Sequence, residues 1–201
     1  MHVLVVVSHP NPNSLSHALA HEFIRGVEAA GNTAELADLH AEGFDPSWSM
    51  ADIEADEGSP APADIVAEQQ RIDRCDAVCM VFPLFWFGMP AMLKGWLERV
   101  WSWGWAYDQL DDHNKSMQKD RTAVLLVPAG ANPNAWEPYE RVEEAMKTIW
   151  CTGTLGYFGF TEKNVHFLNG STGSEERRIK LLETAYEVGL NTTIPESKTT
   201  V

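Results

Sequence analysis

The segment "AVCMVFPLFWFGMPAMLKGW", residues 77–96, contains the clearest structural signal in the chain. Its first six residues, 77–82, form a short continuous apolar run, the pattern of a strand buried on both faces of a sheet. From Pro90 onward apolar side chains recur at helical spacing, and proline is tolerated at the first position of a helix. Between them, two prolines and three aromatic residues fall within eight positions, 83–90. The segment predicts a buried strand, an aromatic-rich turn and a helix.

Strand and helix patterns alternate along the rest of the chain. Further strands are expected at 3–7, 33–39, 121–130 and 165–168, and further helices at 15–30, 64–73, 136–150 and 174–190. Short apolar strands separated by helices favour a parallel sheet with helices on both faces. The expected fold is therefore α/β and flavodoxin-like, with a five-stranded parallel sheet in the order 2-1-3-4-5. Ligands are expected outside the carboxyl ends of strands 1 and 3.

We expect residues 1–190 to form a single flavodoxin-like domain, followed by a polar C-terminal tail at 191–201. Residues 42–63 are rich in Asp, Glu, Pro, Gly and Ser, which predicts a long surface loop. On the helix that begins at Pro90, helical spacing places Trp96 and Trp101 in the core. The same spacing places Arg99, with its charged neighbours, on the opposite face.

Composition excludes several classes of function. The 201 residues include 15 Lys and Arg against 29 Asp and Glu, a formal net charge of −14, which argues against binding nucleic acid or anionic membranes. The three cysteines are odd in number and form no C-x-x-C pair, so neither a disulfide framework nor a zinc site is expected. No stretch approaches the roughly 18 apolar residues of a membrane span, and no targeting segment precedes the first strand. We expect a cytoplasmic protein without membrane insertion.

The segment "SHPNPNSLSHA", residues 8–18, follows the first strand and leads into a helix. Unpaired backbone N–H groups and the positive end of the helix dipole favour a phosphate there. The candidate phosphate-binding residues are His9, Ser14, Leu15 and Ser16. Ser14 as a simple helix cap is an equally good interpretation. The segment contains neither G-x-G-x-x-G nor G-x-x-x-x-G-K-[ST], so a Rossmann site and a P-loop are not supported.

His17 and His21 lie four residues apart, a spacing that zinc ligands can have. No glutamate lies between them in a metalloprotease pattern and no third ligand is evident. We therefore expect two solvated histidines and no metal site.

The turn after the third strand favours a flat aromatic ligand. Its prolines fix the backbone so that amide groups can face the edge of a heterocycle, and Phe85, Trp86 and Phe87 can stack on a ring. Packing of these aromatic residues in the core is the alternative. After the fourth strand, the small residues of "PAGANPN", 128–134, allow close approach of backbone to a ligand, although an ordinary turn would look the same. A phosphate site, an aromatic surface and a close-packed turn at one sheet edge are together what a flavin mononucleotide moiety needs.

Two stretches carry a resemblance to a known family: "ADIVAEQQRID", 63–73, and "VFPLFWFGMPAMLKGWLERVWSWGWAY", 81–107. They resemble the NAD(P)H:quinone oxidoreductases of the DT-diaphorase type and their shorter bacterial relatives, including quinone-reductase subunits of potassium efflux systems. The resemblance is densest over 63–107. The order of elements extends it from residue 3 to about residue 170.

The resemblance implies roles for individual positions. In the phosphate loop it matches His9, Leu15 and Ser16, and it matches Gln69 to a flavin-contacting glutamine. The segment that flanks the isoalloxazine ring is matched by Pro83, Leu84, Phe85, Trp86 and Phe87. The loop at the pyrimidine edge of the flavin is matched by Pro128, Ala129, Gly130 and Ala131.

The resemblance also implies catalytic contacts and shows departures. Trp86 and Phe87 match residues that face the nicotinamide or the quinone, and Tyr107 matches a tyrosine of the acceptor pocket. The mammalian enzymes have a tyrosine and a histidine proposed to relieve charge on the reduced flavin, and these fall at Trp136 and Val142. Tyr139 is a nearby candidate to replace them.

This chain departs from the mammalian enzymes at other positions as well. A second tyrosine of their acceptor pocket aligns with Gln109 of this chain. The mammalian enzymes have two threonines and two glycines at 128–131, and we expect this protein to be without their C-terminal extension.

The function implied is a flavin-dependent NAD(P)H:quinone oxidoreductase with two-electron, ping-pong hydride transfer. The implied cofactor is FAD, with FMN the close alternative, and the implied assembly is a homodimer with pockets completed across the interface. Two other hypotheses stay open: a regulatory flavoprotein subunit docked on a transporter such as a potassium efflux system, and an interaction protein without flavin whose aromatic turn contacts another protein.

Overall fold

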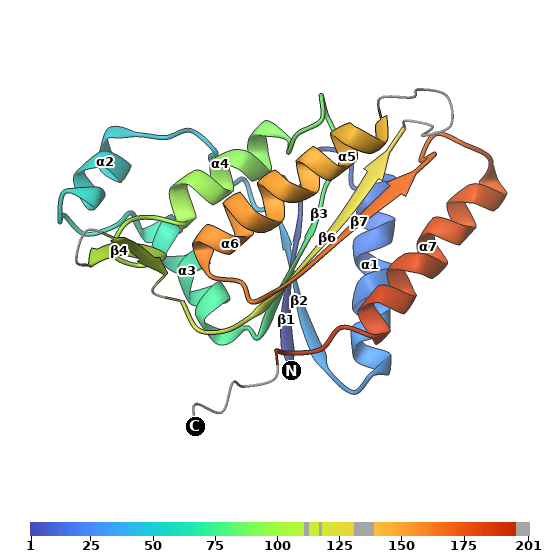
Figure 1. Ribbon diagram of the computed structural model, residues 1–201, viewed down its shortest axis with the longest axis horizontal. Coiled ribbons are helices and arrows are strands. Elements are labelled where there is room, and N and C mark those ends of the chain that lie inside the picture. The colour runs from blue at the N-terminus through green and yellow to red at the C-terminus, as the bar shows by residue number, and fades with distance from the viewer. Residues whose placement is uncertain (111–112, 117, 131–138, 196–201) are drawn as a thin grey trace.

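Five parallel strands form the central sheet of the computed structural model, which describes residues 1–110, 113–116, 118–130 and 139–195 (Figure 1). Their order across the sheet is β2 (Thr33–Asp38), β1 (His2–Val7), β3 (Ala77–Val81), β6 (Thr122–Ala129) and β7 (Glu162–Asn169). Because β6 and β7 are the fourth and fifth strands of this sheet along the chain, the predicted order 2-1-3-4-5 and the flavodoxin-like α/β fold are confirmed.

Helices cover both faces of the sheet (Figure 1). One face is covered by α1 (Leu15–Ala29) and α7 (Glu175–Leu190), and the other by α3 (Ala63–Arg74), α4 (Ala91–Val100) and α5 (Tyr139–Thr148). Alternate residues of each strand serve the two cores: Val3, Val5 and Val7 pack toward α1, whereas Leu4 and Val6 pack toward α3 and α4. Burial on both faces explains why the central strands are continuous apolar runs.

Two glycines bring α1 and α7 into backbone contact. A Cβ atom at Gly26 would collide with the carbonyl oxygen of Tyr186, and one at Gly189 with the carbonyl oxygen of Phe23. This close packing fixes the position of α1, and with it the loop that enters the helix from β1.

The expectation of a loop over residues 42–63 is wrong, because α2 (Met50–Asp56) lies within it. Asp52, on the first turn, accepts hydrogen bonds from the Ser49 amide at 2.7 Å and from the Arg99 guanidinium at 3.1 Å. Arg99 is therefore buried and not on the exposed face of α4 as predicted. A buried charge of this kind is stable only with partners, and Asp52 and Asp64 supply them from outside α4.

Two other elements differ from the sequence-based expectation. An antiparallel hairpin, β4 (Tyr107–Leu110) and β5 (His113–Ser116), lies between α4 and β6. The helix expected at 136–150 is described from Tyr139, and it continues as a π-helix, Ile149–Thr154, and as α6 (Leu155–Phe158). Trp96 is fully buried as predicted, and Trp101 packs partly buried against the same core.

Candidate functional site

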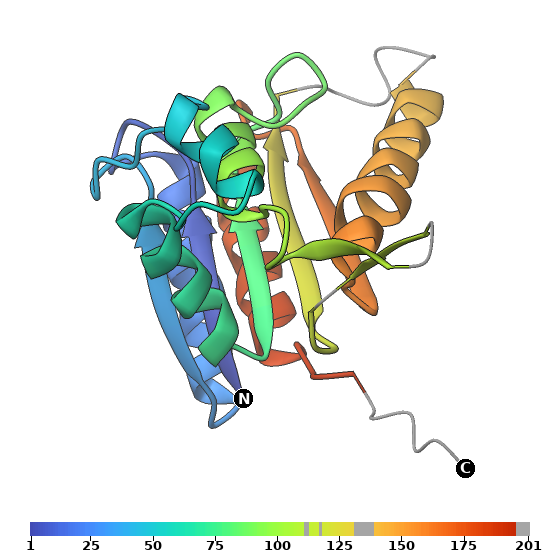
Figure 2. The ribbon, with the colours of Figure 1, turned by 90° about the vertical axis from the view of Figure 1, so that its left-hand side faces the viewer.

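The segments predicted to hold a ligand converge at the carboxyl edge of the sheet (Figure 2). Strands β1 and β3 are neighbours, and the amide of Ser8 donates to the carbonyl of Val81 at 3.1 Å. The amide of Leu84 donates to the carbonyl of Pro128 at 3.0 Å, which joins the segment after β3 to the end of β6. Segments far apart in the sequence are thus joined by backbone hydrogen bonds at one edge of the sheet, as the topology predicts.

Residues 85–88, here called the aromatic turn, have a strained backbone. Phe85 and Gly88 exchange two backbone hydrogen bonds, at 3.3 and 3.0 Å, while Trp86 and Phe87 have φ values of 49° and 60°. Two successive positive φ values define a type I′ turn, which normally takes Gly, Asn or Asp. In a bulky residue this left-handed conformation costs about 1–2 kcal/mol.

The rings of the aromatic turn point away from the core. Trp86 is 96% exposed, Phe85 53% and Phe87 42%, so the alternative of core packing is wrong for these residues. A strained turn that exposes three adjacent aromatic rings indicates a binding surface, because neither the strain nor the exposure favours folding.

The backbone of this region offers fewer free donors than the sequence suggested. Pro83 has no N–H, and the Leu84 amide is already bonded to Pro128. The Phe85 amide is bonded to Gly88 within the turn. Contacts from residues 83–85 to a heterocycle therefore fall mainly to their carbonyl groups and side chains.

Residues 8–16, here called the phosphate segment, end at the N-terminus of α1. Ser14 is the N-cap and accepts the amide of His17 at 3.3 Å, so its capping role is confirmed. Leu15 and Ser16 are the first two helical residues, and a helix leaves such N–H groups without an intrahelical acceptor. These two amides provide the donor pair that an anion at this helix end requires.

His9 lies half-buried in the same segment, and its Nδ1 accepts the amide of Asn11 at 3.0 Å. Burial lowers the pKa of His9, and the neighbouring imidazoles of His17 and His40 lower it further. A neutral His9 with Nδ1 as acceptor carries its proton on Nε2, which makes Nε2 a donor.

His17 is not solvated, so that expectation is wrong. Its side chain is buried, with Nδ1 2.8 Å from Oγ of Ser14 and Nε2 2.9 Å from Oδ2 of Asp38. Asp38 ends β2, whose register places it opposite Val7 at the end of β1. The sequence shows an acidic residue, Asp38, at the end of the neighbouring strand, and this was the signal that could have revealed a partner for His17. The order of the strands in the sheet is needed to bring Asp38 next to α1.

A buried hydroxyl begins the phosphate segment. Ser8 is 1% exposed, and its Oγ has no hydrogen-bond partner in the described part of the chain. An unpaired buried hydroxyl costs about 1–3 kcal/mol, so a ligand that supplies an acceptor at the strand end would be favoured.

The small-residue turn predicted at 128–131 is partly described. Pro128 and Ala129 end β6, and Gly130 is exposed beyond it, where an added Cβ would lie 3.4 Å from the Thr172 side chain. Ala131 and Trp136 lie outside the described residues. Tyr139 begins α5, but its side chain lies outside them as well.

Gln69 lies apart from the aromatic turn. Its buried amide nitrogen donates at 3.0 Å both to the carbonyl of Val100 and to Oγ of Ser102. These acceptors mark the C-terminal end of α4, whereas the aromatic turn precedes the N-terminal end. A flavin contact by Gln69 stays a prediction, and it would have to use the amide oxygen.

Tyr107 also lies toward the C-terminal end of α4. Its ring packs 5.7 Å from the ring of Trp103 and 5.2 Å from that of Tyr157, and it lines a largely apolar cavity of about 390 Å³. Burial raises the pKa of Tyr107, as do the charge of Asp56 and the nearby Tyr157. The phenol therefore stays protonated near neutral pH and can donate a hydrogen bond.

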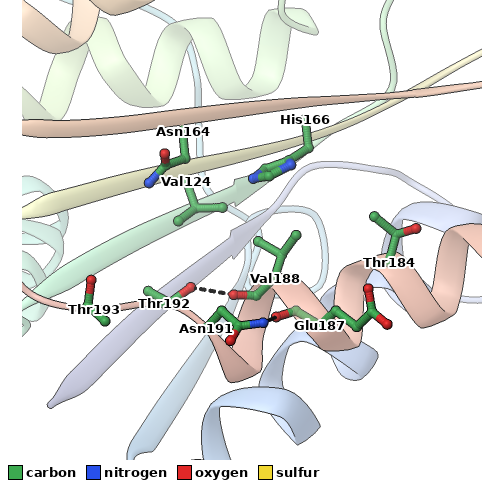
Figure 3. Close-up of a pocket in the computed structure, with 9 residues that line it drawn as sticks. All are labelled: Val124, Asn164, His166, Thr184, Glu187, Val188, Asn191, Thr192 and Thr193. Atoms are coloured by element: carbon green, nitrogen blue, oxygen red, sulfur yellow. Dashed lines mark hydrogen bonds between the residues drawn. The ribbon is translucent and has the colours of Figure 1, made fainter.

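A second cavity, of about 430 Å³, lies at the opposite end of β6 and β7, against α7 (Figure 3). Asn164 and His166 project into it from β7, and Thr184 and Glu187 line it from α7. Burial lowers the pKa of His166, with a further contribution from Lys147. None of the predicted site residues lines this cavity, so it is separate from the carboxyl edge.

The helices of the described residues are too short or too polar to cross a bilayer. The described part of the chain also contains no cluster of three or more His, Cys, Asp or Glu side chains suited to a metal ion.

Comparisons with known proteins agree with this architecture. A family model described as flavodoxin-like fold matches residues 1–188. NAD(P)H dehydrogenase [quinone] 1 of Cavia porcellus is 30% identical over 176 residues, which is 78% of this chain but 64% of that protein. The Rattus norvegicus protein of the same name is 30% identical over 203 residues, covering 90% of this chain and 73% of that protein.

A solved structure of similar length gives the same result. The NAD(P)H:quinone oxidoreductase from Methanothermobacter marburgensis superposes with a TM-score of 0.87 at 31% identity, covering 95% of this chain and 98% of that one. An aromatic turn at the carboxyl edge of a 2-1-3-4-5 sheet, a family match over nearly the whole chain and these relatives lead to one conclusion. This chain belongs to the flavodoxin-like NAD(P)H:quinone oxidoreductase family.

Proposed function

We propose that this protein is a flavin-dependent NAD(P)H:quinone oxidoreductase whose site lies at the carboxyl edge of the sheet. The observation that carries the proposal is the aromatic turn, in which Trp86 and Phe87 adopt left-handed backbone angles and expose their rings. Strain that persists in a folded protein without favouring the fold points to function.

The residues at this edge fit a flavin. The amides of Leu15 and Ser16, with Ser14 and His9 beside them, suit a phosphate. The segment from Pro83 to Phe87 offers a wall for the ring, and the exposed Gly130 leaves room for close backbone approach. A bound flavin supplies two-electron hydride chemistry, accepting hydride from NAD(P)H and passing it to a quinone.

The side chains of the protein would position the nicotinamide or quinone ring and shield it from water. Stacking on Trp86 and Phe87 would hold a nicotinamide or quinone ring parallel to the aromatic turn and exclude water from its face. No acid–base residue is needed for hydride transfer itself, and a protonated Tyr107 could donate to a quinone oxygen. Because donor and acceptor would use one slot in turn, we expect ping-pong kinetics.

The distance between Tyr107 and the aromatic turn favours a homodimer. The ten residues of α4 span about 15 Å, with the turn before one end and the ring partners of Tyr107 beyond the other. Tyr107 of a second copy could complete the acceptor pocket instead. Exposed Trp103, Ile149 and Tyr157 around the same region give such an interface apolar surface.

The cofactor and its location complete the proposal. FAD is favoured by the resemblance over residues 63–107, and FMN is the close alternative. We infer a cytoplasmic protein, which agrees with free thiols at Cys75, Cys79 and Cys151.

The test is purification followed by mass spectrometry of any released flavin, titration of the protein with FAD and FMN, and initial-rate assays with NADH or NADPH and a soluble quinone. Parallel reciprocal plots are expected, whereas intersecting plots would contradict a shared slot. Folded protein that binds neither flavin would overturn the proposal. Flavin-loaded protein without quinone turnover that co-purifies with a transporter would favour the regulatory hypothesis.

Sedimentation analysis tests the assembly. We expect a dimer, and mixed dimers that combine Trp86→Ala and Tyr107→Phe subunits should keep one intact site. A monomer with full quinone turnover would rule out a pocket completed by a second copy.

A further inference from the structure

Three side chains form a hydrogen-bonded chain that begins in the phosphate segment, at Ser14. Oγ of Ser14 lies 2.8 Å from Nδ1 of His17, and Nε2 of the same imidazole lies 2.9 Å from Oδ2 of Asp38. His17 is 4% exposed, so the imidazole is shielded from solvent. Ser14 is at the same time the N-cap of α1, beside the open amides of Leu15 and Ser16.

The location of the protons follows from Asp38. Its Oδ1 accepts the amides of His40 at 3.2 Å and Ala41 at 3.1 Å, while Oδ2 faces His17. Burial acts to raise the pKa of Asp38, but these hydrogen bonds lower it below its usual range. An ionised carboxylate only accepts hydrogen bonds, so Nε2 of His17 must carry a proton. Nδ1 is the nitrogen left to gain or lose one.

Ser14 therefore has two states. When His17 is neutral, the Ser14 hydroxyl donates its hydrogen to Nδ1, and its oxygen accepts the His17 amide. When Nδ1 takes up a proton from solvent, the imidazolium donates to the Ser14 oxygen, whose two lone pairs are then both used. The hydroxyl hydrogen is released and can donate to an anion at the end of α1.

We propose that His17 is a positioning residue that couples protonation to binding of the flavin phosphate, with Asp38 holding the imidazole and Ser14 delivering the hydrogen bond. The inference rests on the proposed function and adds a residue to its phosphate site. The added positive charge behind the helix N-terminus acts in the same direction as the released hydrogen bond.

Three other histidines lie near His17. The ring of His9, from the loop after β1, lies 6.5 Å away in an edge-on arrangement, and His40 follows β2. Burial, together with the influence of His17 and His40, lowers the pKa of His9. His9 therefore takes up a proton at lower pH than an ordinary histidine does. His21, one turn further along α1, is exposed to solvent.

Linkage sets the sign of the effect. If the phosphate binds better to the protonated state of His17, bound phosphate favours protonation, and protonation raises the affinity by the same factor. Affinity is then highest at low pH and falls as pH rises and Nδ1 of His17 loses its proton. Coupling between sites typically amounts to a factor of about 5–150.

The experiment measures dissociation constants by flavin fluorescence between about pH 6 and about pH 8, where histidine titrates. FAD is the main probe because its diphosphate has no ionisation in this range, and riboflavin, which lacks a phosphate, is the ligand control. We expect FAD binding to weaken by about fivefold or more across the range, and riboflavin binding to stay constant.

Variants identify the group responsible. His17→Gln should abolish the pH dependence of FAD binding, and the matched control His21→Gln should retain it. Asp38→Asn should reduce it, because the amide can donate to Nε2 and let neutral His17 donate to Ser14. Circular dichroism checks the fold of each variant.

Nuclear magnetic resonance of the wild type gives a readout that needs no stable variant. The His17 ring signal is identified as the one that His17→Gln removes or Asp38→Asn shifts. At a fixed pH in this range, addition of FAD should move this signal toward the position of the protonated imidazole. A pH-independent FAD affinity, an unchanged pH dependence in His17→Gln or a His17 signal that FAD does not move would each overturn the inference while leaving flavin binding intact. Absence of flavin binding at every pH would overturn the proposed function and this inference together.

Discussion

The aromatic turn and the phosphate segment lie at the same edge of the sheet but are stabilised differently. The turn is held by two backbone hydrogen bonds between residues three positions apart, and its side chains project into solvent. The phosphate segment is held by a buried imidazole that connects the cap of α1 to Asp38, twenty-one residues away from His17 in the sequence. The binding surface of the turn is therefore exposed to solvent, whereas the imidazole that supports the phosphate segment is buried.

Substitutions in the two regions should therefore have different effects. A change in the exposed rings should alter the reaction with little effect on folding. A change in the hydrogen-bonded chain of Ser14, Asp38 and the buried His17 should alter folding and phosphate affinity together. Substitutions in the two regions therefore test whether their roles differ in this way.

The largest effect is expected from Trp86→Ala. Loss of a stacking partner worth about 0.5–1.5 kcal/mol should lower kcat/KM for a quinone by up to about tenfold. The free energy of unfolding should stay within about 0.5 kcal/mol of wild type, because the ring is 96% exposed. Trp48→Ala, which removes a partly exposed tryptophan elsewhere, is the control and should leave turnover unchanged. Unchanged quinone turnover in Trp86→Ala would contradict the location of the site.

Ser14→Ala should act on both stability and binding. Loss of an N-cap costs about 1 kcal/mol of unfolding free energy, which urea denaturation can measure. Ser174 caps α7 with the same 3.3 Å bond to the third helical residue, so Ser174→Ala is a matched control. Ser14→Ala should lose at least as much stability as Ser174→Ala, because it also removes the hydrogen bond to His17, but only Ser14→Ala should weaken FAD binding. Equal FAD affinity in the two variants would separate Ser14 from the phosphate site.

The strain in the turn can be isolated by comparing two variants that both lack the Trp86 ring. Glycine adopts a φ of 49° without penalty, so Trp86→Gly should be about 1 kcal/mol more stable than Trp86→Ala. The matched pair at Phe85, which is not among the residues with positive φ, should show no such gain. A glycine variant less stable than the alanine variant would mean that the turn is not strained.

The smallest effect is expected from the pH dependence of stability at Asp38. Because its pKa is lower in the folded state, its contribution is present above the unfolded pKa and is lost as pH falls through the folded pKa. The stability of the wild type should therefore decrease more than that of Asp38→Asn between about pH 6 and about pH 3, as followed by urea denaturation. Parallel curves for the two proteins would show that Asp38 is not stabilised by its hydrogen bonds with His17 and the backbone.

Much of this edge could be predicted from local sequence. The apolar run at 77–82 and the proline at residue 90 locate β3 and the start of α4 within a residue or two. Two prolines around three aromatic residues predicted a turn that can hold a flat ring. These features depend on neighbours in the chain, which a single sequence displays directly.

The failures share a different cause. The sequence predicts that Arg99 is exposed, but in the structure it is buried in an ion pair with Asp52. It likewise predicts that His17 is exposed, but His17 is buried with Asp38 as its partner. In each case the partner lies twenty or more residues away in the sequence, and periodicity describes only the helix on which the residue sits. The left-handed backbone of Trp86 was equally invisible, because no local preference favours it.

The five strands of the parallel sheet, the principal helices around it and the family could be predicted from the sequence, because hydrophobic periodicity and turn chemistry are local properties. Packing in three dimensions settled which polar residues are buried, which rings are exposed, and that Ser14, His17 and Asp38 form one hydrogen-bonded chain. The physical reason is that burial of a charge or an imidazole is stable only with a partner, and the partner is supplied by the packing of distant segments.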